Sequence, residues 1–166
     1  GTGQGMERWI SMRTFYVLSS DLKHFSKAVR LFDFDAAADL EMATIDVIVR
    51  KYEEGYVALI KDERWPEDCQ TGKTIRLSFS NHLTGPYSNP GSPITPSWYE
   101  APSIVPGGSD AAWYMYAENY PNRYTLFMAD SLRGAWRSTD VHMDGIRHGC
   151  VIVVSKKQYS DLLSAF

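Results

Sequence analysis

Short apolar runs recur along this chain at a spacing that few folds can accommodate. Eight runs rich in Val, Ile, Tyr, Phe and Thr are separated by Gly, Pro, Asn and Asp, and they cover 13–20, 44–52, 55–62, 73–80, 101–107, 111–118, 123–130 and 148–155. Such runs predict β-strands ended by turns. Several short strands at regular spacing are typical of an all-β sandwich, barrel or propeller.

A repeated turn favours one of these architectures. The stretches SSDLKHFSKAV, SNHLTGPYSNP and ADSLRGAWRST each place a small or polar pair before a leucine, and an aromatic residue after it. The matched residues are Leu22, Leu83 and Leu132, which lie 61 and 49 residues apart. An apolar run follows each turn, and two more strand-like runs lie between it and the next matched leucine. Each unit therefore carries four strands.

A second series repeats with nearly the same period. The runs TIDVIVRKY, WYEAPSIVP and IRHGCVIVV carry Asp46, Glu100 and His148 at their heads, 54 and 48 residues apart. A unit of about 50 residues with four strands is the sequence signature of a β-propeller blade. We therefore predict an all-β partial propeller over 14–166, with two whole blades flanked by part-blades, and a junction with the start of a part-blade over 1–13.

The C-terminal stretch has a different period. Ser155 is a good N-cap residue, and Tyr159, Leu162, Leu163 and Phe166 follow at helical spacing. This pattern predicts a short C-terminal helix.

Two whole blades do not close a ring, because a propeller usually has at least four. We expect the chain either to be a portion of a larger propeller or to complete the ring as a homodimer. The opening GTGQGMERW resembles a junction more than a native start. A periplasmic or secreted location is favoured.

Composition argues against several kinds of partner. The net charge is −3, and no stripe of Lys and Arg is available to neutralise phosphates, so no nucleic-acid partner is expected. No apolar run approaches the roughly 20 residues of a membrane helix. Cys69 and Cys150 lack metal-ligand spacing. We expect a loop Cys69 and a buried Cys150, with a disulfide between them as the alternative.

Aromatic residues make up 13% of the chain. Trp65, Trp98, Tyr99 and Tyr120 lie in or beside loops near the leading ends of strands, where their rings could stack on sugars. Packing within the core or the hairpins is the alternative for each ring.

The three polar residues of the second series converge in a propeller. The first strand of each blade lines the central channel, so equivalent positions of successive blades meet around the axis. Two carboxylates and an imidazole at a channel mouth suit acid–base chemistry on a sugar, or a cation. A polar lining of a water-filled channel is the alternative.

These motifs together resemble the five-bladed propeller glycoside hydrolases of family 43, which act on arabinan- and xylan-type glycosides. Asp46 matches the strand-leading Asp of the family, and His148 matches its later His-Gly signature. Glu100, Ala101 and Pro102 match the family's Glu-Gly-Pro signature, with Ala101 in place of Gly. KDE at 61–63 and the LTGPY and LRGAW turns also match, and the resemblance covers nearly the whole chain from about Thr14.

The resemblance implies a mechanism. Glu100 would be the general acid, and Asp46 would orient it and raise its pKa by like-charge repulsion. His148 would line the channel beneath the sugar and hold a cation through water, with Ca²⁺ or Na⁺ as structural ions and no cofactor required for the reaction. The family inverts, with a base on the first strand of the first blade. No Asp of this chain stands at that point of the repeat, so the alternative is a non-catalytic carbohydrate-binding module.

Two further charged groups remain open. Lys61, Asp62 and Glu63 end a predicted strand, either as a solvated hairpin or as a substrate edge. Arg147 would point to the face opposite His148, which favours packing or a buried ion pair over a ligand.

Overall fold

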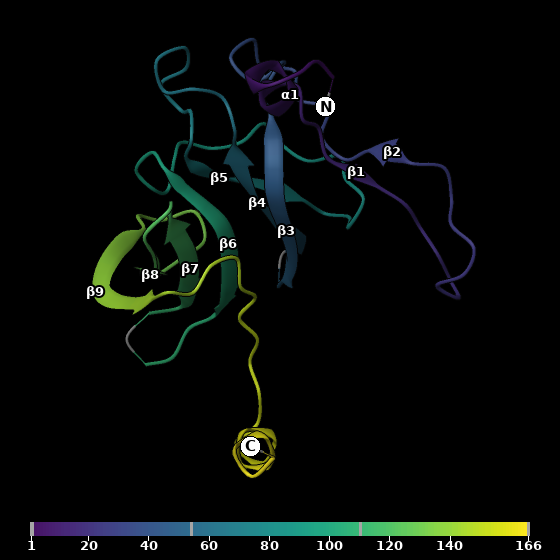
Figure 1. The fold of residues 1–166 in the computed structure, drawn as a ribbon. Coiled ribbons are helices and arrows are strands. Elements are labelled where there is room, and N and C mark those ends of the chain that lie inside the picture. Colours follow the sequence, from purple (N-terminus) through teal and green to yellow (C-terminus); the bar gives the residue numbers. More distant parts are fainter. Residues whose placement is uncertain (1, 54, 110, 166) are drawn as a thin grey trace.

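Strands dominate the computed structural model, which describes residues 2–53, 55–109 and 111–165 (Figure 1). The elements in chain order are α1 (Met6–Ile10), β1 (Phe15–Tyr16), β2 (Val29–Arg30), β3 (Thr44–Tyr52), β4 (Gly55–Asp62), β5 (Ile75–Ser80), β6 (Tyr99–Pro106), β7 (Trp113–Asn119), β8 (Arg123–Ala129), β9 (Arg137–Asp144) and α2 (Lys156–Leu163). None of the described helices has the length and apolar character needed to cross a membrane.

Two antiparallel sheets carry the fold. One has the order β3-β4-β5 and the other β6-β7-β8-β9, so neighbours in sequence are neighbours in space. The strands β1 and β2 form a separate arm (Figure 1). This arrangement confirms a β-rich fold made of consecutive antiparallel sheets. The described residues form two adjacent sheets and an arm, and they do not close a ring.

The main core lies where the two sheets meet. Alternate side chains of β4 and β5 pack against those of β6, β7 and β8, because successive strand residues point to opposite faces. The buried members are Val57, Leu59, Ile75, Leu77, Ile104, Met115, Ala117, Phe127 and Leu132. On the other face of β4, Ala58 and Ile60 pack against Phe32, Phe34 and Tyr87. The first sheet is therefore covered on both sides.

The first whole blade has three strands instead of the predicted four. Residues 88–94 run beside β5, and Ser88, Gly91 and Ile94 donate backbone N–H groups to three of its carbonyls. These contacts recur every three residues instead of every two. Pro90 and Pro93 have no N–H to donate, which prevents a regular ladder.

The predicted strand over 148–155 is also absent, because no strand of the described chain pairs with this run. Ile152 and Val153 remain 68% and 71% exposed. The predicted C-terminal helix is confirmed as α2, with Ser155 and Gln158 forming a capping box. The helix buries no residue, and it lies apart from the sheets at the end of an extended segment (Figure 1).

Candidate functional site

Both sheets interrupt their first strand at the same point. The register of β3 shifts after Ile45, and that of β6 shifts after Glu100. The next residues, Asp46 and Ala101, have φ angles of 47° and 46°, and His148 has 42°. Non-glycine residues rarely adopt this conformation, and bulges of this kind redirect side chains. The structural counterpart of Asp46 is therefore Ala101, so matching Asp46 with Glu100 was wrong by one residue.

Asp46 of β3 forms a hydrogen bond with the bulge of β6. Its Oδ2 accepts the backbone N–H of Ala101 at 2.9 Å. On the other side, the buried Tyr124 hydroxyl donates to the carbonyl of Ala101 at 3.1 Å and accepts the N–H of Gly149 at 2.6 Å. These bonds tie β3, β6 and β8 to the C-terminal segment and bring the heads of the three repeats together.

Glu100 lies at the centre of this junction and is only 9% exposed. Its Oε2 accepts a hydrogen bond from the Lys61 ammonium at 2.6 Å, and its Oε1 lies 3.1 Å from Nε2 of His148. The structure thus brings Asp46, Glu100 and His148 to one place, as the repeat predicted. Lys61 enters as a direct partner of Glu100.

The charge state of Glu100 differs from the one the resemblance implied. Burial raises the pKa of this carboxyl, but the hydrogen bond and charge of Lys61, and then those of His148, outweigh it. The net pKa of Glu100 is lowered, so the expected rise is wrong for this chain. The carboxylate of Asp46 is turned to the N–H of Ala101. Glu100 is therefore ionised at neutral pH.

Lys61 belongs to a buried row of alternating charges. Its ammonium also lies 3.0 Å from Oε2 of Glu63, whose other oxygen pairs with Lys73. Burial lowers the pKa of Lys61, but the hydrogen bond to Glu100 and the charge of Glu63 raise it overall. Lys61, Asp62 and Glu63 are 4%, 0% and 7% exposed. The solvated-hairpin interpretation of this stretch is therefore wrong.

Glu118 is a functional candidate that the sequence reasoning missed. It is fully buried on β7, directly across from Glu100. Its Oε1 accepts a hydrogen bond from Nε–H of Arg147 at 2.6 Å, and its Oε2 accepts one from the backbone N–H of His148 at 3.3 Å. Like charges on neighbouring strands repel, and here Lys61 and Arg147 offset them. A regular hairpin of the runs WYEAPSIVP and AAWYMYAEN would pair Glu118 with Ala101, and it is the register shift after Glu100 that brings the two glutamates opposite each other.

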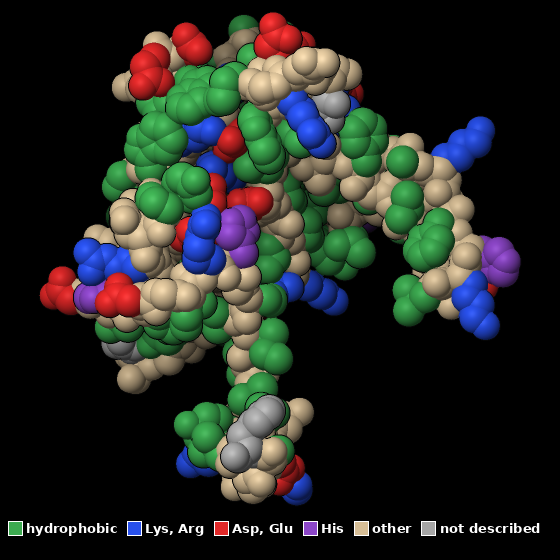
Figure 2. All heavy atoms as spheres, in the orientation of Figure 1, with side chains coloured by type: hydrophobic (Ala, Val, Ile, Leu, Met, Phe, Trp, Pro, Cys, Tyr) green, Lys and Arg blue, Asp and Glu red, His purple; other side chains and the backbone are tan. Residues whose placement is uncertain are grey.

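Arg147 takes part in an ion pair, but its side chain is 49% exposed, so the pair is not the buried one that was predicted. Its guanidinium and the His148 ring both lie near Oε1 of Glu100, at 3.7 and 3.1 Å, so the predicted placement of the two side chains on opposite faces is wrong. Its guanidinium lies 5.0 Å from the centre of the Tyr120 ring. Figure 2 shows charged side chains of both signs and a histidine gathered at the middle of this face of the molecule.

Three of the four predicted aromatic residues line one edge of this charged cluster. Trp98 and Tyr120 are 40% and 46% exposed, and the N–H of Tyr120 donates to the carbonyl of Trp98. The Trp65 and Trp98 rings meet edge to face with their centres 5.6 Å apart. The Lys73 ammonium lies 4.5 Å from the centre of the Trp65 ring. Trp98 has a φ of 70°, a strained conformation for a bulky residue.

Two expected positions lie elsewhere. Tyr99 packs edge to face on Phe127 at 5.1 Å, beside the main core, and does not join the cluster. Cys69 and Cys150 are free thiols, and Cys150 is exposed, so its predicted burial is wrong. The reason is that the run over 148–154 has no partner strand to cover it.

The predicted cation remains a prediction. Glu100, Glu118 and His148 each offer a ligand atom, and these atoms lie within 4.8 Å of one another. However, Lys61 and Arg147 already neutralise the two carboxylates. Ca²⁺ prefers six to eight oxygen ligands, so this donor set fits Ca²⁺ poorly, and we assign no catalytic step to a metal.

Comparison with known proteins finds little. No protein-family model matches the chain, and no curated protein matches it. Two crystal structures of variants of an exo-β-1,3-galactanase from Phanerochaete chrysosporium, each with β-1,3-galactotriose, are 14% identical to it, with a TM-score of 0.40. The alignments cover 80% of this chain and 43% of the galactanase, so the chain spans less than half of that protein's length.

Proposed function

We propose that this chain is part of a glycoside hydrolase of the five-bladed propeller type, which in its complete form hydrolyses arabinan- or xylan-type glycosides with inversion. The convergence of Asp46, Glu100 and His148 at the heads of three successive repeats carries the proposal. Half-exposed Trp98 and Tyr120 stand beside this cluster. A carboxyl group flanked by exposed aromatic rings suits a sugar, whose C–H face stacks on a ring while its hydroxyls reach charged groups.

In this proposal Glu100 protonates the leaving glycosidic oxygen, and therefore it must gain a proton first. In a complete propeller, a carboxylate on the first strand of the first blade would lie close to Glu100 and would raise the pKa of Glu100 by like-charge repulsion. The same carboxylate, about 6.5–9.5 Å away, would act as the base that activates water. Asp46 would act as a positioning residue, since it holds the bulge that follows Glu100.

A second candidate is a carbohydrate-binding module without catalysis. The 2.6 Å contact between Lys61 and Glu100 favours it, because an ionised carboxylate accepts hydrogen bonds from sugar hydroxyls but donates no proton. Both candidates place carbohydrate at the same cluster, and they differ in what Glu100 does there.

The test is binding and hydrolysis of arabinan and xylan by the natural full-length protein and by its Glu100→Gln variant. Glu53→Gln is the control, because Glu53 is exposed and lies outside the cluster. Loss of turnover by about 10²–10⁴-fold with binding retained supports the hydrolase. Glycan binding without turnover by the unchanged protein selects the binding module. The absence of both binding and turnover refutes both candidates.

A further inference from the structure

A cavity of about 700 Å³ lies between α1 and the loop of residues 64–69. Its volume falls within the roughly 300–1,000 Å³ of small-molecule sites. The lining includes Glu7, Ile10, Arg13, Glu41, Trp65 and Asp68. Neither the predicted acid–base residues nor the charged row belongs to this lining, so the cavity is separate from the Glu100 cluster.

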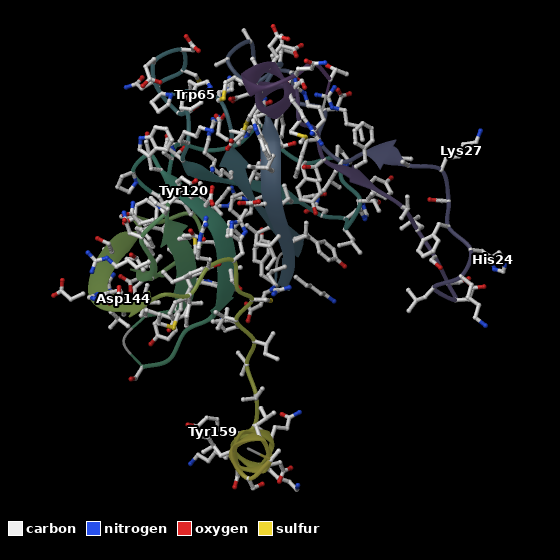
Figure 3. All side chains as sticks on the ribbon, in the orientation of Figure 1. His24, Lys27, Trp65, Tyr120, Asp144 and Tyr159 are labelled. Carbon is white, nitrogen blue, oxygen red and sulfur yellow. The ribbon has the colours of Figure 1, made fainter. Side chains whose placement is uncertain are left out.

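Trp65 connects the cavity with that cluster. Its ring lines the cavity and also contacts Trp98. Trp98 in turn is bonded through its backbone to Tyr120, and the Arg147 guanidinium covers Tyr120 and lies 3.7 Å from Oε1 of Glu100. Trp65 and Tyr120 lie along the same side of the molecule (Figure 3). Three aromatic residues, Tyr120, Trp98 and Trp65, are therefore linked in turn between Glu100 and the cavity, the first two through the backbone and the last two through their rings.

The polar lining of the cavity indicates the kind of ligand. Three carboxylates, those of Glu7, Glu41 and Asp68, face two guanidinium groups. Arg13 pairs with Glu41 at 2.6 Å, and Arg64 is already neutralised by buried carboxylates. The remaining charge is negative. Carboxylates accept hydrogen bonds from hydroxyl groups and repel anions, so the lining favours a neutral sugar over a uronic acid.

We infer that this cavity is a distal glycan subsite, which receives the far end of a neutral oligosaccharide bound at Glu100 and laid across Trp98 and Trp65. The inference rests on the proposed function, since it requires carbohydrate at the Glu100 cluster. It adds a preference for chain length that neither the hydrolase nor the binding module requires.

Calorimetric titration with oligosaccharides of increasing length tests the subsite. The probes are α-1,5-arabino-oligosaccharides and β-1,4-xylo-oligosaccharides of two to six units, titrated into the full chain. Two variants alter the cavity: Trp65→Ala removes its aromatic wall, and Ala38→Trp fills it from an exposed position. Trp9→Ala is the matched control, because Trp9 is an exposed tryptophan of α1 outside the lining.

The affinity of the unchanged chain should rise by roughly tenfold or more between two and six units, a difference of about 1.4 kcal/mol. Trp65→Ala and Ala38→Trp should each remove this rise, and Ala38→Trp should leave disaccharide affinity unchanged, while Trp9→Ala keeps the rise. Affinity independent of length in the unchanged chain, or a rise that persists in Ala38→Trp, overturns the subsite but leaves the proposed function standing. No binding at any length overturns both.

Discussion

Replacing Lys61 with Met tests whether the buried charge row stabilises the junction of the sheets. Lys61 is 4% exposed, and its ammonium is the partner of Glu100 at 2.6 Å and of Glu63 at 3.0 Å. Met fills a similar volume without the charge. Glu63 keeps Lys73, but Glu100 keeps only His148 and the distant Arg147. Breaking a buried pair by removing one partner costs about 3–5 kcal/mol, so we expect Lys61→Met to lose that much unfolding free energy at pH 7.

The loss should depend on pH in a definite direction. The lowered pKa of Glu100 stabilises the folded chain above the carboxyl's unfolded pKa, and this contribution disappears as pH falls through the folded value. Without Lys61, the two largest contributions that lower the pKa of Glu100 are gone, so we expect this pKa to be higher in the variant. Protonation then removes the unpaired charge, so the cost of Lys61→Met should shrink as pH falls from 7 toward about 4.

Urea unfolding followed by tryptophan fluorescence measures this cost, because guanidinium chloride would screen the charges. Lys157→Met is the control, since Lys157 pairs with Asp161 on the exposed face of α2 and does not contact Glu100, and its cost should stay small at both pH values. A cost of Lys61→Met below about 1 kcal/mol at pH 7, or one that stays constant down to pH 4, would refute the reasoning.

Three further changes probe the junction and the C-terminal helix. Tyr124→Phe leaves the N–H of Gly149 and the carbonyl of Ala101 without a partner and should cost about 1–3 kcal/mol in urea unfolding; no loss would show that the hydroxyl is dispensable. Ala101→Gly should gain about 0–1 kcal/mol, because glycine relieves the left-handed φ of 46°; a loss of 1 kcal/mol, usual for this change in a strand, would contradict the strain. Ser155→Ala removes the cap that holds the N–H of Gln158, so helical circular dichroism should fall while the urea midpoint of the sheets stays unchanged, since α2 buries nothing; a shifted midpoint would mean that α2 packs on the fold.

The strand pattern was predictable where the ladder hydrogen bonds are local. The runs 44–52 and 55–62 coincide with β3 and β4, because alternating apolar residues and a short turn suffice to define a hairpin. The fourth strand of the first whole blade and the strand over 148–155 failed for different reasons. Prolines interrupt the segment that runs beside β5, and the run over 148–155 lacks a neighbouring strand in the described chain. Apolar composition reports burial, but it does not report whether a partner strand exists.

The candidate site was likewise predictable only in part. The repeat in the amino-acid sequence was enough to predict that Asp46, Glu100 and His148 converge, because residues at one period occupy one end of successive sheets. It could not show the bulges, because of which the residue of the second sheet that corresponds to Asp46 is Ala101 and not Glu100. It also could not show Lys61 and Glu118, which come from the second strand of each sheet. Charge state depends on distances of a few ångströms between such strands, so only the tertiary structure decided that Glu100 is an ionised partner of a buried lysine.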